Sequence, residues 1–277
     1  MGGFTSFWVA GKHPHLVGSA SNFMGSSEFD VGPNGFPSEY RHTEMYRNYE
    51  GMRTRIVTGT RDFIRWYHRR MNAVWDFVRP HHEHEEFEFD HSTPGMAKTL
   101  RFHMNAFARP LPPPRLWHHI DVYPVFDVWC YAVETDRTRP GFTAIENVSP
   151  TGFRSSVREW LPGGRLMPFV NVRVATSGVY EAGRVYRVSD VNLRTGAGGQ
   201  SRLRADGKGR LHLTLGWRSA RSGHRAGGRS AVVGGGVAGG GRAVDRQWTQ
   251  CPAPAFHREQ GIGRSSPTPM CASSRPR

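Results

Sequence analysis

The sequence predicts a fold in three parts: an α/β region, an all-β region and a tail without packed structure. Three observations support this fold class. Strand and helix patterns alternate up to about residue 108, period-two alternation of apolar residues takes over from 116 to 215, and both patterns stop from residue 216 onwards. A stiff proline-rich segment separates the first two regions. The predicted boundaries are therefore 1–108, 109–115, 116–215 and 216–277.

The first region has the alternation expected of a sheet covered by helices. Short strands are predicted at HLVGSAS (15–21) and TRIVTG (54–59), and EFEFD (86–90) alternates with Phe87 and Phe89 on one face. Between the last two, residues 63–78 carry apolar side chains at helical spacing. Strands and helices in this order predict an α/β sheet.

A second helix is expected after the strand at 86–90. Thr93 is a candidate N-cap, with Pro94 at the first helical position. Its predicted buried stripe consists of Met96, Leu100, Met104 and Phe107.

The all-β region changes to strands separated by turns about every ten residues. Three apolar faces are predicted, with turn signals such as LPGG and ADGKG between them. The faces contain Phe126, Val128, Cys130 and Ala132; Val170, Val172 and Val174; and Leu211, Leu213 and Leu215. This pattern predicts a sandwich of immunoglobulin-like type. Trp117, Trp129 and Trp160 are assigned mainly to its core, with a sugar-binding platform as the alternative.

Beyond residue 216 the composition is rich in Gly, Ala, Pro and Ser and has no apolar face to bury, so disorder is expected. Ten Arg, no Lys and two acids give this tail +8 of the net charge of +14. Arg without Lys on this background favours an out-of-frame translation, and a natural basic tail is the alternative. Because the remainder of the chain is only modestly basic, nucleic acid is not an expected partner.

Cysteine content and hydropathy narrow the class of protein and its expected compartment further. Three cysteines without C-x-x-C spacing indicate neither a disulfide framework nor a zinc site, and they mildly favour a reducing, cytoplasmic compartment. No apolar run is long enough to span a bilayer, so no membrane partner is expected. His81, His82 and His84 are expected in a loop, without the helical spacing of a metal site. No metal or cofactor is predicted.

Two residues lie where α/β sheets build their sites. Asp62 follows the strand at 54–59, and His91 follows the strand at 86–90 and precedes a helix. Taken singly, Asp62 could be a helix N-cap and His91 a solvated loop residue. Together, the order strand, Asp, helix, strand, His, helix fits the last two members of a Ser-Asp-His triad. His91 would then be the general base and Asp62 the residue that orients it.

The motifs MGGFTSFW, TGTRDF and FDHSTPGMAKTLRFH resemble the putative-esterase, enterochelin-esterase-like family of α/β-hydrolases. The resemblance covers about residues 1–108 and implies the C-terminal half of a catalytic domain. It implies hydrolysis of a carboxylic ester through an acyl-serine, with Asp62 and His91 as acid and base and the backbone N–H of Met1 in the oxyanion hole. The nucleophile of such a family would precede Met1, since no internal G-x-S-x-G is found.

The resemblance also implies a substrate and a partner. The substrate would be a small-molecule or polysaccharide-linked ester, and a complementing N-terminal half would cover the edge of a sheet reduced to about three strands. The alternative is a catalytically inactive chain whose β-sandwich acts as a binding or interaction module.

Overall fold

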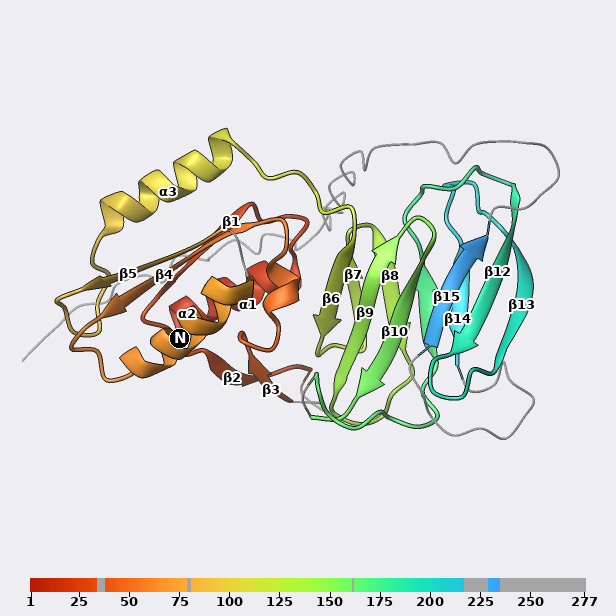
Figure 1. Ribbon diagram of the computed structural model, residues 1–277, viewed down its shortest axis with the longest axis horizontal. Helices are drawn as coiled ribbons and strands as arrows, with labels where there is room; N and C mark the ends of the chain where they lie inside the picture. Colours follow the sequence, from red (N-terminus) through yellow and green to blue (C-terminus); the bar gives the residue numbers. More distant parts are fainter. Residues whose placement is uncertain (34–37, 79–80, 161, 217–228, 235–277) are drawn as a thin grey trace, which may run out of the picture. The chain divides into compact units, whose positions relative to one another are not determined.

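The computed structural model describes residues 1–33, 38–78, 81–160, 162–216 and 229–234. This part of the chain is mostly strands, arranged in several small sheets, with three α-helices (Figure 1). None of the helices in these ranges is both long and apolar enough to cross a bilayer.

The N-terminal region contains a three-stranded parallel sheet in the order β1-β4-β5. Its strands are β1 (Ser19–Phe23), β4 (Arg53–Gly59) and β5 (His82–Phe87). The predicted strand at 54–59 is confirmed as the buried central strand. The strand predicted at 86–90 lies earlier, because His82 and His84, which were expected in a loop, belong to β5. Phe89 is consequently outside the strand and half exposed.

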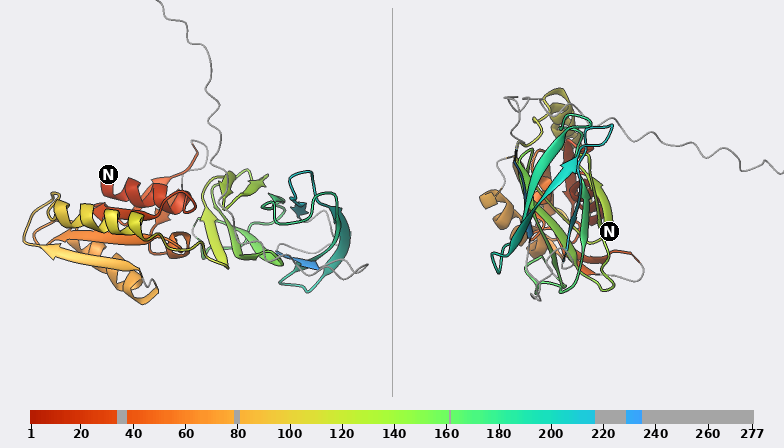
Figure 2. Two further views of the ribbon diagram at one scale, coloured as in Figure 1. Left: turned by 90° about the horizontal axis from the view of Figure 1, so that it is seen from above. Right: turned by 90° about the vertical axis from the view of Figure 1, so that its right-hand side faces the viewer.

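Helices cover both faces of this sheet. Helices α1 (Gly2–Lys12) and α2 (Arg65–Val78) lie on one face, and α3 (Met96–Ala108) lies alone on the other (Figures 1 and 2). A small hairpin of β2 (Glu28–Val31) and β3 (Ser38–Arg41) and the 3-10 helix η1 (Tyr46–Tyr49) lie between β1 and β4 in the chain.

The predictions for α3 are wrong in two respects. Its N-cap is Gly95, in the left-handed region at φ 69°, and no side-chain cap bond forms. Its predicted buried stripe of Met96, Leu100, Met104 and Phe107 faces outward, and Phe107 is 92% exposed. The helix instead buries its other face, with Thr99, Phe102 and Ala106. Thr99 and His103 on or beside that face have polar partners on the sheet: Thr99 Oγ1 accepts from Arg55 Nε at 3.1 Å, and His103 bridges Ser19 and Ser21 at 2.8 Å each.

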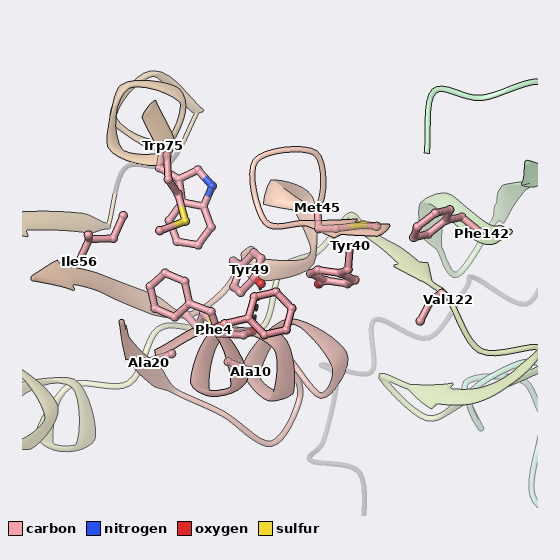
Figure 3. Packing of buried hydrophobic residues seen from close by; sticks show 13 residues of the cluster. Phe4, Ala10, Ala20, Tyr40, Met45, Tyr49, Ile56, Trp75, Val122 and Phe142 are labelled. Carbon is pink, nitrogen blue, oxygen red and sulfur yellow. Dashed lines mark hydrogen bonds between the residues drawn. The ribbon is translucent and has the colours of Figure 1, made fainter. Parts of the chain in front are cut away.

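The core on the opposite face of the sheet is rich in aromatic rings (Figure 3). The rings of Phe7 and Trp75 stack at 4.9 Å, and Tyr49 packs against both. The same cluster includes Val122 and Phe142 from the β-rich region. One continuous apolar core therefore joins the first region to the second.

The β-rich region consists of a six-stranded and a four-stranded antiparallel sheet. The six-stranded sheet has the order β13-β12-β15-β10-β9-β6, and the four-stranded sheet has the order β14-β11-β8-β7. Rings from the two sheets meet in the interior, where Tyr131 lies 5.2 Å from Trp117 and 6.3 Å from Phe153. The strands are β6 (Trp117–Asp121), β7 (Val125–Val128), β8 (Tyr131–Thr135), β9 (Phe142–Ser149), β10 (Gly152–Arg158), β11 (Val172–Ala175), β12 (Val185–Asn192), β13 (Gly198–Arg204), β14 (His212–Leu215) and β15 (Arg229–Gly234).

The single face predicted for Phe126 to Ala132 is broken by a tight turn. Trp129 and Cys130 both have positive φ, at 47° and 64°, and connect β7 to β8 as a two-residue hairpin loop. Cys130 is disulfide-bonded, which contradicts the expectation drawn from the odd number of cysteines. Of the sandwich tryptophans, Trp117 is buried in the core as expected, whereas Trp160 is exposed.

Most of the predicted tail lies outside the described residues. Residues 229–234 are an exception, because β15 pairs with both β10 and β12 in the middle of the larger sheet. The expectation of no packed structure is wrong for these six residues. Their sequence, RSAVVG, has adjacent β-branched valines, which favour a strand.

Candidate functional site

The candidate site lies at the carboxyl edge of the three-stranded sheet. Because β1, β4 and β5 are parallel, the segments that leave them meet at one edge. These segments contain Met24 and Gly25 after β1, Asp62 after β4, and His91 after β5. Met24, Asp62 and His91, which are far apart in the chain, thus lie at the same edge of the sheet.

Asp62 and His91 form a hydrogen-bonded pair there. Nδ1 of His91 lies 3.1 Å from Oδ2 and 3.2 Å from Oδ1 of Asp62. The Asp62 side chain is 0% exposed, whereas that of His91 is 46% exposed. An ionised carboxylate only accepts hydrogen bonds, so Nδ1 carries the proton and Nε2 presents a lone pair. A buried acid therefore orients a solvent-accessible base.

Asp62 also has the local role that its position before a helix suggested. Its Oδ1 accepts from the backbone N–H of Ile64 at 3.0 Å, as in an Asx turn. The two interpretations of Asp62 from sequence are compatible, since one carboxylate serves the turn and the imidazole at the same time. This shared bonding fixes the carboxylate rotamer.

The other ring nitrogen of His91 is open. Within the described ranges, no hydrogen bond reaches Nε2 of His91 from any side chain. The ring of Phe63 lies 5.1 Å from the imidazole and is itself largely exposed. The pair therefore has a basic nitrogen and an aromatic neighbour directed to solvent.

Close backbone contacts hold the loops around the pair. A Cβ on Gly59 would lie 2.5 Å from the carbonyl oxygen of Phe89 and 2.8 Å from that of Asp90. The end of β4 and the loop carrying His91 can touch only because this position is glycine. The N–H of Ser92 contacts Sδ of the buried Met24 at 2.9 Å, which connects the same loop to β1.

Beneath the pair lies a buried polar network that sequence reasoning did not identify. Thr58 Oγ1 lies 2.9 Å from Nε2 of His84 and 3.4 Å from Nδ1 of His68. Nε2 of His68 lies 2.6 Å from the carbonyl oxygen of Gly25, so it donates to that group. Burial lowers the pKa of both histidines. The signal that could have revealed His68 is its helical spacing with the buried residues Met71 and Trp75.

Met1 lies at the start of α1, near this edge of the sheet. Among the described residues, no hydrogen bond joins it to Asp62 or His91. Its carbonyl accepts from Thr5 N at 3.0 Å as the N-cap of α1. The start of α1 packs tightly on the loop after β1, because a Cβ on Gly25 would lie 2.3 Å from the backbone nitrogen of Phe4. The first helical turn and the Asp62–His91 pair therefore share the carboxyl edge of the sheet.

The histidines of β5 have protein partners. Besides the contact of His84 with Thr58, His82 lies 2.8 Å from Oδ1 of Asn72. Among the described residues, no group of three or more His, Cys, Asp or Glu side chains has an arrangement that could hold a metal ion.

Comparison with known proteins yields no relative. No family model, no curated protein and no solved structure matches the chain.

Proposed function

We propose that this chain carries the acid and base of a serine-type carboxylic ester hydrolase with an α/β-hydrolase sheet. The observation that supports the proposal most strongly is the Asp62–His91 hydrogen bond, with a buried carboxylate and an imidazole whose Nε2 is open. Its position at the carboxyl edge of a parallel sheet is where hydrolases of this class carry the pair.

In the proposed reaction, Nε2 of His91 takes the proton of a serine hydroxyl as Oγ bonds to the ester carbonyl carbon. The imidazolium, stabilised by Asp62, then returns the proton to the leaving alkoxide as the C–O bond breaks. Water repeats both steps to release the acid and regenerate the serine. This scheme assigns the oxyanion donors to the N–H groups at the start of α1, with Met1 in first place.

Among the described residues, no serine hydroxyl hydrogen-bonds to Nε2 of His91, so the scheme takes its serine from elsewhere. We place it on a polypeptide segment that pairs with β1, the edge strand nearest α1, so that it reaches Nε2 of His91. The substrate is a small-molecule or polysaccharide-linked ester.

The first test measures hydrolysis of p-nitrophenyl acetate by the full chain. An oriented imidazole can attack this activated ester by itself, so a basal rate is expected without the serine. His91→Ala and Asp62→Asn are each expected to lower that rate about tenfold or more. His212→Ala is the matched control, since His212 also pairs with a carboxylate, Asp206, at 2.9 Å. Equal rates in all three variants would contradict the proposal.

A second test uses a fluorophosphonate probe and mass spectrometry of the intact chain. No serine of the chain is expected to be labelled. A labelled serine that requires His91 would support the hydrolase chemistry but place the nucleophile within this chain.

A second candidate function rests on a different observation. The β-rich region exposes the aromatic rings of Trp160 and Phe169 near a cavity lined by arginines. This arrangement favours a binding module, which need not be catalytic.

A further inference from the structure

The cavity in the β-rich region has an unusual lining. Its volume is about 620 Å³, which is within the range of small-ligand sites. Three arginines and one carboxylate supply its charge, and three apolar residues form the remainder of its wall. The lining residues are Arg139, Glu159, Arg165, Leu166, Pro168, Phe169 and Arg194.

The positive charge of this cavity is only partly neutralised. Nε and Nη2 of Arg165 lie 3.2 Å and 3.1 Å from one carboxylate oxygen of Glu159. The guanidinium groups of Arg139 and Arg194 have no carboxylate partner among the described residues. Two planar, permanently charged donors are therefore available to an anion.

Phe169, the aromatic residue that lines the cavity, and the nearby Trp160 have a backbone conformation that bulky residues rarely adopt. Phe169 has φ 61° and is 62% exposed, and Trp160, next to Glu159 in the chain, has φ 64° and is 67% exposed. Left-handed backbone at such residues costs free energy. Both rings are nevertheless largely exposed.

The segment that carries this wall is firmly attached. Arg158 and Leu166 form a β-bridge, and the N–H of Met167 donates to the carbonyl of Val157 at 2.8 Å. Nη1 of Arg158 also donates to the carbonyl of Gly164 at 2.8 Å. The cavity is thus preformed, which reduces the entropy lost on binding.

We propose that this cavity binds an acidic carbohydrate, a chain of sugar rings that carry carboxylates. The carboxylates pair with Arg139 and Arg194, whose forked donors match a carboxylate's two oxygens. The apolar face of a sugar ring packs on Phe169. The cavity is open to solvent on one side, so a sugar chain longer than the cavity can extend out of it. A lipid would leave its tail in water there. The proposal does not depend on the hydrolase function, because it concerns binding alone.

The test is isothermal titration calorimetry of the full chain with trigalacturonate, and with neutral maltotriose for comparison. Trigalacturonate is expected to bind and maltotriose to bind much more weakly. The double variant Arg139→Gln with Arg194→Gln is expected to weaken trigalacturonate binding about tenfold or more. Phe169→Ala is expected to weaken both sugars.

A matched control removes two charges elsewhere. Arg187 and Arg202 are exposed cross-strand neighbours on β12 and β13 and do not line the cavity. Their double Gln variant has the same net charge as the cavity variant and is expected to bind normally. The proposal is overturned if trigalacturonate does not bind, or if the two sugars bind equally well. It is also overturned if the two double variants lose the same affinity, or if a single-stranded oligonucleotide binds more tightly than trigalacturonate. Thermal melts of every variant check that the fold is retained.

Discussion

Nη1 of Arg47 in η1 lies 2.9 Å from Nδ1 of His118 in β6. The arginine can only donate, so Nδ1 of His118 accepts and the imidazole is neutral. The contact joins the N-terminal region to the β-rich region through a buried histidine. The stability of the contact between the two regions therefore depends on pH.

The first prediction concerns the pH dependence of stability. Burial, followed by the charge of Arg47, lowers the pKa of His118 from 6.5 to about 4. The unfolded chain therefore binds a proton that the folded chain does not between about pH 6.5 and 4, and the free energy of unfolding falls as pH drops through this window. His118→Asn keeps an acceptor but does not titrate. Urea unfolding at several pH values should give a shallower pH slope for this variant, and an unchanged slope would contradict the assignment.

The second prediction concerns the contact between α1 and the loop after β1. Gly25→Ala would place a methyl group 2.3 Å from the nitrogen of Phe4 and 2.5 Å from the carbonyl carbon of Gly3. Backbone atoms cannot yield cheaply, so a loss of about 2 kcal/mol or more in the free energy of unfolding is expected. Gly18→Ala is the control, because nothing lies within 4 Å of its added methyl. Similar unfolding midpoints for the two variants would show that the two segments are not in such close contact.

The third prediction compares two phenylalanines of α3. Phe102 is 7% exposed and Phe107 is 92% exposed. Phe102→Ala is expected to cost about 3 kcal/mol, since a buried ring is lost, whereas Phe107→Ala should change stability by less than about 0.5 kcal/mol. Chemical denaturation followed by circular dichroism measures both. A larger loss at Phe107 would mean that the helix packs with the face that the sequence pattern predicted.

The orientation of α3 shows why sequence patterns can predict a helix without predicting its buried face. Apolar residues occur on two sides of this helix. The exposed stripe, which was predicted to be buried, contains more large apolar residues than the face that is buried. The choice depends on Arg55, Ser19 and Ser21 of the sheet below, which provide hydrogen-bond partners for Thr99 and His103. Such partners come from distant segments, and no periodicity within the helix encodes them.

The candidate site was predictable where it depends on position along the chain. Asp62 follows a strand that its own residues predict closely, and His91 follows one that was predicted a few residues too late. Parallel pairing brings the ends of both strands together. The network of Thr58, His68 and Gly25 was not predictable, because it joins a strand, a helix and a loop through contacts that depend on packing. The roles proposed for Asp62 and His91 are predictions that the hydrolysis assay tests, and the role of Met1 remains a prediction.

Strand β15 has a consequence for how the larger sheet is assembled during synthesis. The strand lies between β10 and β12 but is made after every strand it pairs with or separates. A nascent chain that ends before residue 229 therefore has a gap one strand wide, about 10 Å between β10 and β12. Until β15 has left the ribosome, both flanking edges have unpaired backbone groups and can capture another chain. The rate at which the chain is translated through residues 229–234 thus affects how long the sheet stays open to misassembly.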